Sequence, residues 1–160
     1  MMNALTNEAE IVTKEGRRIR VRRIGPGDAP RLVDIFERMS AESRYRRWNQ
    51  AMDEVGPKEV WREALEIAGA DPQHHLGLIA LAEDGTAVGA ARIVETKVGE
   101  AEVAISIADA FQGLGIGTQL MRLLALEAKK QGYGRLVAAI RNDNPAIWKV
   151  FKRLPFEVQR

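Results

Sequence analysis

A glycine-rich loop between an apolar strand-like run and a helix-like run constrains this chain more than any other feature of its sequence. The loop consists of Gln112, Gly113, Leu114, Gly115, Ile116 and Gly117. Glycines let a backbone turn tightly and direct several N–H groups toward one point. The following helix adds its own unpaired N–H groups and the positive end of its dipole. The segment therefore predicts a binding site for a diphosphate.

Two common diphosphate-binding loops do not fit this segment. A dinucleotide-binding loop reads Gly-x-Gly-x-x-Gly and is followed by a strand that ends in an acidic residue. Here the glycines alternate, and the next apolar run, residues 136–140, ends at Arg141. A Walker loop needs Gly-Lys-Ser/Thr, which is missing. A helix-capping turn without a ligand is the remaining alternative, and three glycines in five residues argue against it because glycine is costly without a reason.

The hydrophobic pattern predicts an α/β (α+β) fold around one mixed sheet. Strands are expected at residues 17–24, 76–82, 87–94, 101–108 and 136–140. Helices are expected after Asp28 as N-cap, from Pro57 to Gly69, from the glycine loop to Gly132, and from Pro145. The pair Asp84-Gly85 predicts a hairpin turn. The length of 160 residues fits a single domain over 1–160, with residues 1–15 as a flexible N-terminal segment.

Composition excludes several classes of site. Cysteine is absent, so neither a disulfide nor thiol catalysis is available. The only histidines, His74 and His75, are adjacent and would point to opposite faces of a strand, so no metal is expected. No apolar run is long enough to cross a bilayer, and the polar, acidic start is unlike a signal peptide, which predicts no membrane partner and a cytoplasmic location.

Arginines crowd two segments, residues 17–23 and 44–47, although the formal net charge is only +2. Such clusters can bind nucleic acid, attract the phosphates of a cofactor, or solvate a strand edge. No nucleic-acid-binding motif accompanies them, so nucleic acid is not an expected partner. Among the tryptophans, Trp61 and Trp148 fit helical apolar faces and are expected in the core.

The pattern Gln-x-x-Gly-x-Gly between a strand and a helix resembles the signature of the GNAT acetyltransferases, with Gln112, Gly115 and Gly117 at its fixed positions. The resemblance implies the GNAT fold, in which helices flank a mostly antiparallel sheet, and it implies acetyl-CoA as co-substrate. The pyrophosphate would lie on the loop and the pantetheine arm beside the preceding strand. The implied cofactor-binding residues are Ile105, Ile107, Gln112, Gly113, Leu114, Gly115, Ile116, Gly117, Thr118, Asn144 and Phe151.

A narrower likeness involves three other segments. Residues 24–28, the run 36–45 and the stretch 101–104, which reads Ala-Glu-Val-Ala, resemble the catalytic domain of bacterial protein lysine acetyltransferases. This likeness implies a protein lysine as the amine acceptor. Two alternatives remain: an acetyltransferase for small-molecule amines, and a non-catalytic acyl-CoA-binding module.

Glu102 is the candidate general base. A lysine amine has a pKa near 10.4, so forming the free amine at neutral pH costs about 4 to 5 kcal/mol. Strand alternation places Glu102 on one face with Ala104 and Ser106, and the apolar Val103 and Ile105 on the other. Partial desolvation would raise the pKa of Glu102 toward the value that a base needs. The alternative is a solvated strand residue, with Glu100 on the same face as second candidate. A backbone N–H near Ile107 would polarise the thioester carbonyl.

Two departures from the family pattern stand near the C-terminus. Many GNAT enzymes have a tyrosine that protonates the thiolate, and Phe151 occupies that position here. The family's final helix is followed by Gly-Phe and two strands, whereas this sequence has Pro155-Phe156 and ends at Arg160. We therefore expect C-terminal strands that are shortened or missing. A second copy of the chain could cover such an edge, so a homodimer is compatible with the sequence.

Overall fold

Six strands form one sheet in a computed structural model that describes residues 8–40, 56–138, 149 and 152. The strands are β1 (Ala9–Val12), β2 (Arg18–Arg23), β3 (His75–Leu81), β4 (Ala87–Lys97), β5 (Glu100–Ile107) and β6 (Arg135–Val137). They lie side by side in sequence order. Pairing is antiparallel from β1 to β5, and β6 runs parallel to β5. This confirms the predicted mixed, mostly antiparallel sheet.

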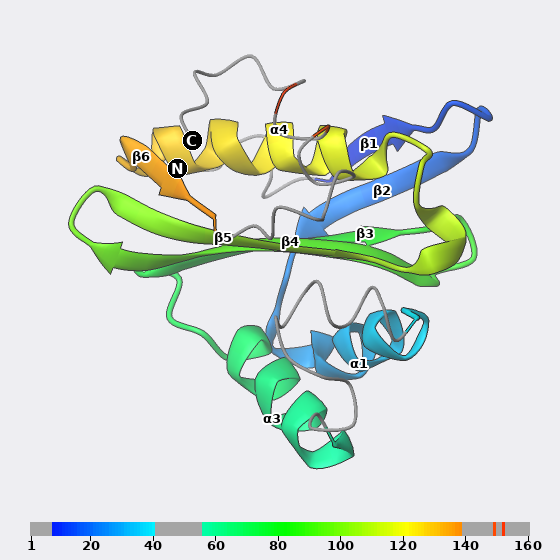
Figure 1. Cartoon of the computed structure of the whole chain (residues 1–160), viewed down its shortest axis with the longest axis horizontal. Helices are drawn as coiled ribbons and strands as arrows, with labels where there is room; N and C mark the ends of the chain where they lie inside the picture. Colours follow the sequence, from blue (N-terminus) through cyan, green and yellow to red (C-terminus); the bar gives the residue numbers. More distant parts are fainter. Residues whose placement is uncertain (1–7, 41–55, 139–148, 150–151, 153–160) are drawn as a thin grey trace.

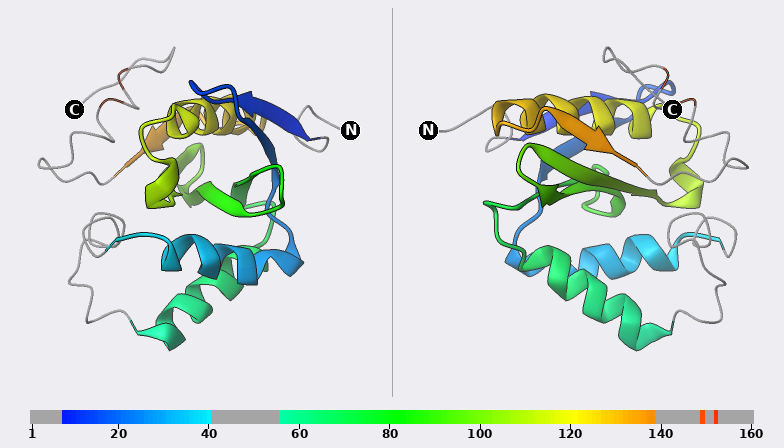
Figure 2. Two further views of the ribbon diagram at one scale, coloured as in Figure 1. Left: turned by 90° about the vertical axis from the view of Figure 1, so that its right-hand side faces the viewer. Right: turned by 60° about the vertical axis from the view of Figure 1, so that its left-hand side comes forward.

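Helices cover both faces of the sheet (Figures 1 and 2). The helices are η1 (Pro26–Asp28), α1 (Ala29–Glu37), α3 (Pro57–Ala68), η3 (Asp109–Phe111) and α4 (Ile116–Lys130). Helix α4 lies on one face, and α1 and α3 lie on the other. The predicted helices that begin near Asp28, Pro57 and the glycine loop are confirmed. The expected final helix from Pro145, with Trp148, lies outside the described residues.

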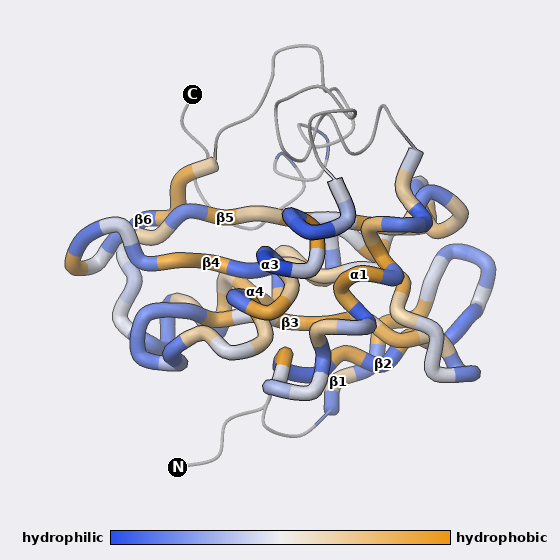
Figure 3. The backbone as a smooth tube through the Cα atoms, turned by 90° about the horizontal axis from the view of Figure 1, so that it is seen from below, coloured by the Kyte–Doolittle hydropathy of each residue, from blue (hydrophilic) through white to orange (hydrophobic). Residues whose placement is uncertain are grey.

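The larger core lies between the sheet and α4. Every second residue of the strands faces this core, and α4 contributes positions at helical spacing. Leu78 and Ile93 of the sheet and Leu120 and Leu124 of α4 are fully buried. In Figure 3 the strands β3 and β5 are mostly hydrophobic, whereas the turns at the ends of the sheet are hydrophilic. Continuous packing of this kind supplies most of the free energy that stabilises the fold.

The second layer packs α1 and α3 against each other and against the opposite face of the sheet. Helix α3 uses Val60, Ala64 and Ala68, which are spaced four residues apart and are buried. Trp61 and Leu65 lie one position further around the helix and are 42% and 59% exposed. The expectation that Trp61 belongs to the core was therefore wrong. The helix approaches its neighbour through small side chains, which leaves the tryptophan on the outer face.

The N-terminal part of the chain differs from the expectation of a flexible segment over residues 1–15. Ala9–Val12 forms β1 and pairs with β2 in the register Ile11↔Ile19. Strand β2 is consequently an inner strand between β1 and β3, so its arginines do not solvate the edge of the sheet. Ile11 is 1% exposed and extends the α4-side core.

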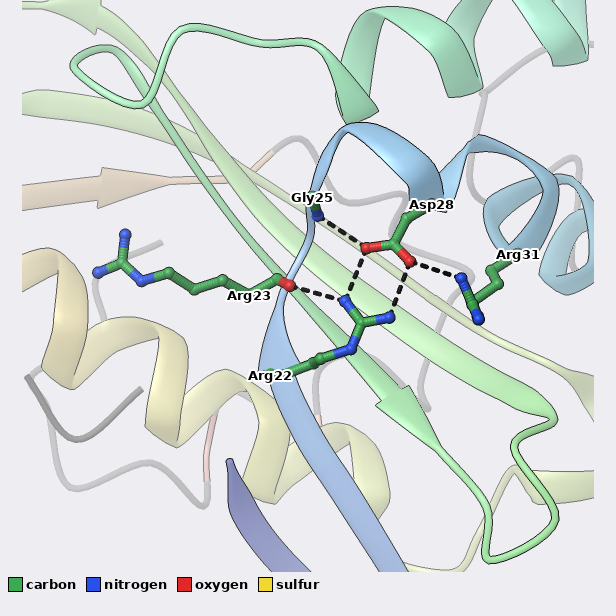
Figure 4. A network of polar contacts seen from close by, with 5 residues as sticks. All are labelled: Arg22, Arg23, Gly25, Asp28 and Arg31. Carbon is green, nitrogen blue, oxygen red and sulfur yellow. Dashed lines mark hydrogen bonds and ion pairs between the residues drawn. The ribbon is translucent and has the colours of Figure 1, made fainter. Parts of the chain in front are cut away.

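Two arginines of β2 hold the sheet to its flanking helices. Arg22 makes a bidentate ion pair with Asp28, with Nη–Oδ distances of 2.7 and 2.8 Å (Figure 4). The same carboxylate accepts hydrogen bonds from the Gly25 N–H (2.7 Å) and Arg31 (3.1 Å). On the other face, Arg23 pairs with the buried Glu127 of α4 at 3.0 Å.

Asp28 occupies the predicted N-cap position of α1, but its side chain makes no hydrogen bond with the helix N-terminus. Burial works to raise the pKa of Asp28, and the hydrogen bonds from Arg22 and Gly25, with the charges of Arg22 and Arg31, outweigh it. The pKa therefore lies below its usual value. The carboxylate serves as a buried anchor between β2 and α1 rather than as a helix cap.

Candidate functional site

Strands β5 and β6 separate after three paired positions. Their parallel register runs from Glu100↔Arg135 to Glu102↔Val137. Beyond Glu102, within the part of the chain that the structure describes, no strand pairs with β5 on the side away from β4. The second half of β5 therefore presents an open backbone edge.

The direction of the backbone groups along β5 follows from two hydrogen bonds. The Ala108 N–H donates to Val88 O on the β4 side at 2.9 Å, whereas Gly99 O accepts from the Gly134 N–H on the opposite side, also at 2.9 Å. Successive residues of a strand point their backbone groups to alternate sides. Ile105 and Ile107, which share the parity of Gly99, therefore direct their N–H and C=O groups into the open edge. Their side chains pack against the α4-side core.

The glycine loop lies at the end of this edge. Gly113 and Gly115 have φ angles of 79° and 88°, a region in which other residues are strained. Gly115 is the N-cap of α4, and no side chain caps the helix. Among the described residues, none accepts a hydrogen bond from the N–H groups of 113–118. Nothing lies within 4 Å of the position that a Cβ would take on Gly113. The loop thus offers consecutive backbone donors to an anion.

The side chains of the loop hold it in place. Ile116 is 1% exposed, and Leu114 packs against the same core. Gln112 donates from Nε2 to Ile107 O at 3.0 Å and to Asp109 Oδ1 at 3.3 Å. Gln112 therefore fastens the loop to the last residue of β5. Gly117 and Thr118 follow in the first turn of α4.

A pocket lies on the face of β5 that points away from α4. It is lined by Ala104 and Ser106 of β5, by Ala90 and Arg92 of β4, and by apolar residues of α1 and α3 that include Phe36 and Val60. Strand alternation placed Ala104 and Ser106 on this face in advance, and the structure confirms it. The pocket and the open edge thus share a strand, with small side chains between them.

One ion pair lies in this otherwise apolar pocket and was not predicted. Arg92 Nη2 lies 3.4 Å from Glu63 Oε1, and the two side chains are 23% and 22% exposed. The sequence held one indication of this ion pair, which is the presence of an arginine within the apolar run of β4. Glu63 lies on a helix whose inward face could not be assigned correctly while Trp61 was placed in the core.

The two candidate bases differ in their surroundings. Glu102 is exposed, at the last paired position before the strands separate, and it forms no ion pair with any described residue. Glu100 pairs with Lys97 at 3.7 Å and with Arg135 at 3.4 Å. Its carboxylate is therefore engaged in holding β4, β5 and β6 together. The partial burial expected for Glu102 is not observed.

Several expectations lie outside the described residues. These concern Asn144, Phe151, the second arginine cluster and the C-terminal strands. Within the described ranges, no group of three histidine, aspartate or glutamate side chains could hold a metal ion. None of the helices in those ranges has the length and apolarity needed to cross a membrane.

Comparisons with known proteins point in the same direction as the geometry. The acetyltransferase (GNAT) family model matches residues 34–156. The crystal structure of the GNAT domain of S. lividans PAT is 30% identical, covers 100% of this chain and 93% of that one, and superposes with a TM-score of 0.84.

Two curated relatives align with most of this chain. The acetyltransferase Pat of Mycolicibacterium smegmatis is 31% identical over 147 residues, which is 90% of this chain and 43% of that protein. This chain thus spans less than half the length of that relative. The L-methionine sulfoximine/L-methionine sulfone acetyltransferase of Pseudomonas paraeruginosa is 27% identical over 143 residues, which is 86% of this chain and 80% of that protein.

Proposed function

The chain belongs to the acetyltransferase (GNAT) family, and from that premise we propose that it transfers an acetyl group from acetyl-CoA to the side-chain amine of a protein lysine. One observation carries the proposal. The open edge of β5 leads directly to a loop whose N–H groups at 113–118 have no acceptor among the described residues. A molecule in which a linear arm joins a diphosphate to a thioester suits this arrangement.

In this proposal acetyl-CoA is held mainly by hydrogen bonds with the protein backbone. The N–H groups of the glycine loop and of the first turn of α4 bind the diphosphate, where the helix dipole adds to the attraction. The amide groups of the pantetheine arm pair with the N–H and C=O groups of Ile105 and Ile107, as an added strand would. The N–H of Ile107, which points into the open edge, polarises the thioester carbonyl.

Glu102 acts as general base in this proposal. The acceptor amine loses a proton to the Glu102 carboxylate, directly or through a water, and its lone pair attacks the carbonyl carbon. The nitrogen of the tetrahedral intermediate is positively charged; as the intermediate collapses to the amide, the C–S bond breaks, the nitrogen's proton passes to the thiolate directly or through water, and Glu102 returns its own proton to solvent. The position of Glu102 at the fork between β5 and β6 supports this role, and so does the engagement of Glu100 in two ion pairs.

The acceptor side chain lies in the pocket beside Ala104 and Ser106. Its mostly apolar lining suits the four-carbon stem of a lysine. The likeness of residues 24–28, 36–45 and 101–104 to the catalytic domain of bacterial protein lysine acetyltransferases supports a protein acceptor. A small-molecule amine that carries a carboxylate is the second candidate, because Arg92 lies in the same pocket and a relative acts on methionine derivatives.

The test separates an enzyme from an acyl-CoA binder. Titration calorimetry with acetyl-CoA, and with NAD as control, measures the cofactor; release of free thiol in the presence of lysine peptides or methionine sulfone measures turnover. We expect Glu102→Gln to lower kcat by about 10²- to 10⁴-fold while the Kd for acetyl-CoA stays within about twofold. Glu100→Gln on the same face is the matched control and retains turnover. Undiminished kcat in the Glu102 variant would exclude this residue as the base, and saturable binding without turnover on any amine would favour the binder.

A further inference from the structure

We propose that Lys14, on the turn between β1 and β2, binds the diphosphate of acetyl-CoA together with the glycine loop. The inference rests on the proposed seat of the diphosphate on that loop. Residues 112–118 contain no basic side chain, so the loop itself supplies hydrogen bonds but no full positive charge. A diphosphate carries negative charge that backbone donors neutralise only in part. A cation from another part of the chain is therefore expected nearby.

The β1–β2 turn is tied to the loop at two points. The Lys14 N–H donates to Leu114 O at 3.4 Å, and Gln119 of α4 donates from Nε2 to Val12 O at 3.2 Å. The Lys14 stem passes close to the loop as well. Its Cε lies 3.9 Å from the position that a Cβ would occupy on Gly115. Segments one hundred residues apart in the sequence thus meet at the N-terminus of α4.

The turn that carries Lys14 is well fixed. Thr13 is 4% exposed, and its N–H donates to Arg17 O at 2.9 Å. In return the Arg17 N–H donates to Thr13 Oγ1 at 3.1 Å. A side chain that leaves a fixed turn loses less conformational freedom when it binds a ligand, which favours affinity.

The charge of Lys14 is available for a ligand. The side chain is exposed, and no acidic side chain among the described residues pairs with it. Arg17 holds a second positive charge beside the loop, with its guanidinium carbon 4.7 Å from the ring centroid of Phe111. Lysine suits a diphosphate as a compact charge with three rotatable donors, while the loop provides the directional N–H groups.

Titration calorimetry on four proteins tests the proposal: the wild type, Lys14→Met, Lys14→Arg and Lys129→Met. Lys129 lies exposed at the far end of α4, so its replacement removes the same charge away from the loop. Each protein is titrated with acetyl-CoA and with acetyl-dephospho-CoA, which retains the diphosphate and the thioester but lacks the 3′-phosphate. We expect Lys14→Met to weaken the binding of both ligands by about tenfold or more. The dependence of Kd on salt concentration should also become shallower, because one charge no longer contributes.

The control variants distinguish a failure of the Lys14 inference from a failure of the proposed function. Lys14→Arg and Lys129→Met should bind both ligands within about twofold of the wild type, and all four proteins should melt together because the substituted side chains are exposed. Wild-type affinity in Lys14→Met overturns the inference and leaves the proposed function standing. A loss confined to acetyl-CoA overturns it too, because the partner is then the 3′-phosphate. Absence of binding by the wild type overturns the proposed function itself.

Discussion

The glycines of the loop act through their backbone conformation, which sets the direction of the chain. Gly115 adopts a φ of 88°, which directs the chain from β5 into α4 and leaves the N–H groups of the first turn exposed to a ligand. Gly85, in the β3–β4 turn, has nearly the same φ of 87° but lies away from the site. Neither glycine can be replaced without backbone strain. Only Gly115 lies in the loop that is proposed to bind the cofactor.

Gly115→Val and Gly85→Val are a matched pair for that reason. Both variants should lose about 1 to 2 kcal/mol of unfolding free energy, because valine is strained in the left-handed region. Only Gly115→Val should also weaken acetyl-CoA binding, by more than tenfold, since strain at a φ of 88° would displace the N–H groups of the loop. Urea unfolding and calorimetric titration measure the two effects. Equal affinities in the two variants would place the diphosphate elsewhere.

His75 gives a second residue-level prediction, which concerns pH. Burial, and to a smaller extent the charge of Arg92, lowers the pKa of His75 from 6.5 to about 4. The unfolded chain therefore takes up a proton at a higher pH than the folded chain does. Stability should decline as the pH falls from 6.5 toward 4, and His75→Gln should make this decline shallower. NMR titration of the ring and urea unfolding at several pH values test this; a ring that titrates near 6.5 contradicts it.

Elements are joined by buried charges rather than by caps. The junction between β2 and α1 depends on Asp28, which is 2% exposed and accepts hydrogen bonds from Arg22, Gly25 and Arg31. The junction between β2 and α4 depends on Arg23 and Glu127. These two links fix the direction in which β2 leaves the sheet, and with it the position of the helix that lines the pocket.

Asp28→Asn tests the first junction. The pKa of Asp28 is held below 3.8, so the carboxylate stabilises the fold at neutral pH, and the contribution is lost as the pH falls through the folded-state pKa. We expect the variant to unfold about 2 to 3 kcal/mol more easily than the wild type at pH 7. The difference should shrink below pH 3.8. Urea unfolding across this range measures it, and a difference that does not vary with pH would point to packing instead of charge.

The sequence was informative where local rules decide the structure. Asp84-Gly85 predicted the hairpin, and the prolines and glycines around α3 and α4 predicted their ends. Prediction from the sequence failed where contacts between residues far apart in the chain determine the structure. Ala9–Val12 is too short to be recognised alone and becomes a strand only because β2 offers it a partner. The ion pairs of Arg22, Arg23 and Arg92 likewise depend on residues that only the fold brings near.

The site residues divide along the same line. The loop and the alternation along β5 followed from spacing, so Ala104 and Ser106 were placed correctly on the pocket face. The exposure of Glu102 did not follow, because it depends on where β6 leaves β5. Lys14 could not be predicted for a similar reason, because its contact with Leu114 joins segments that are far apart in the sequence.

The whole molecule consists of a sheet between two unequal helical layers (Figure 1). The α4 layer closes the larger core and carries the glycine loop at its N-terminus. The α1–α3 layer encloses the pocket with the other face of β4 and β5. In the proposed function the cofactor lies along the open edge of β5 and the acceptor lies on its pocket face, so the main core is in one layer and the proposed acceptor pocket is in the other.

Two leucine truncations distinguish the layers. Leu120 of α4 is 0% exposed, whereas Leu65 of α3 is 59% exposed. Leu120→Ala should lower the unfolding free energy by about 2 to 5 kcal/mol, since it leaves a cavity in the main core. Leu65→Ala should change it by about 0.5 kcal/mol or less. Thermal and urea unfolding provide the comparison. Equal losses would mean that the outer face of α3 is covered in solution.

The open edge of β5 has a consequence for how this protein tolerates mutation. Every residue except proline carries a main-chain N–H, so recognition through main-chain amides does not depend on which side chain a residue has. Replacing Ile105 or Ile107 by most other residues retains the donor, and only proline deletes it, because proline has no N–H. Substitution at these positions is therefore restrained by the fit of the side chain into the core, while the backbone groups at the open edge are retained whatever the side chain.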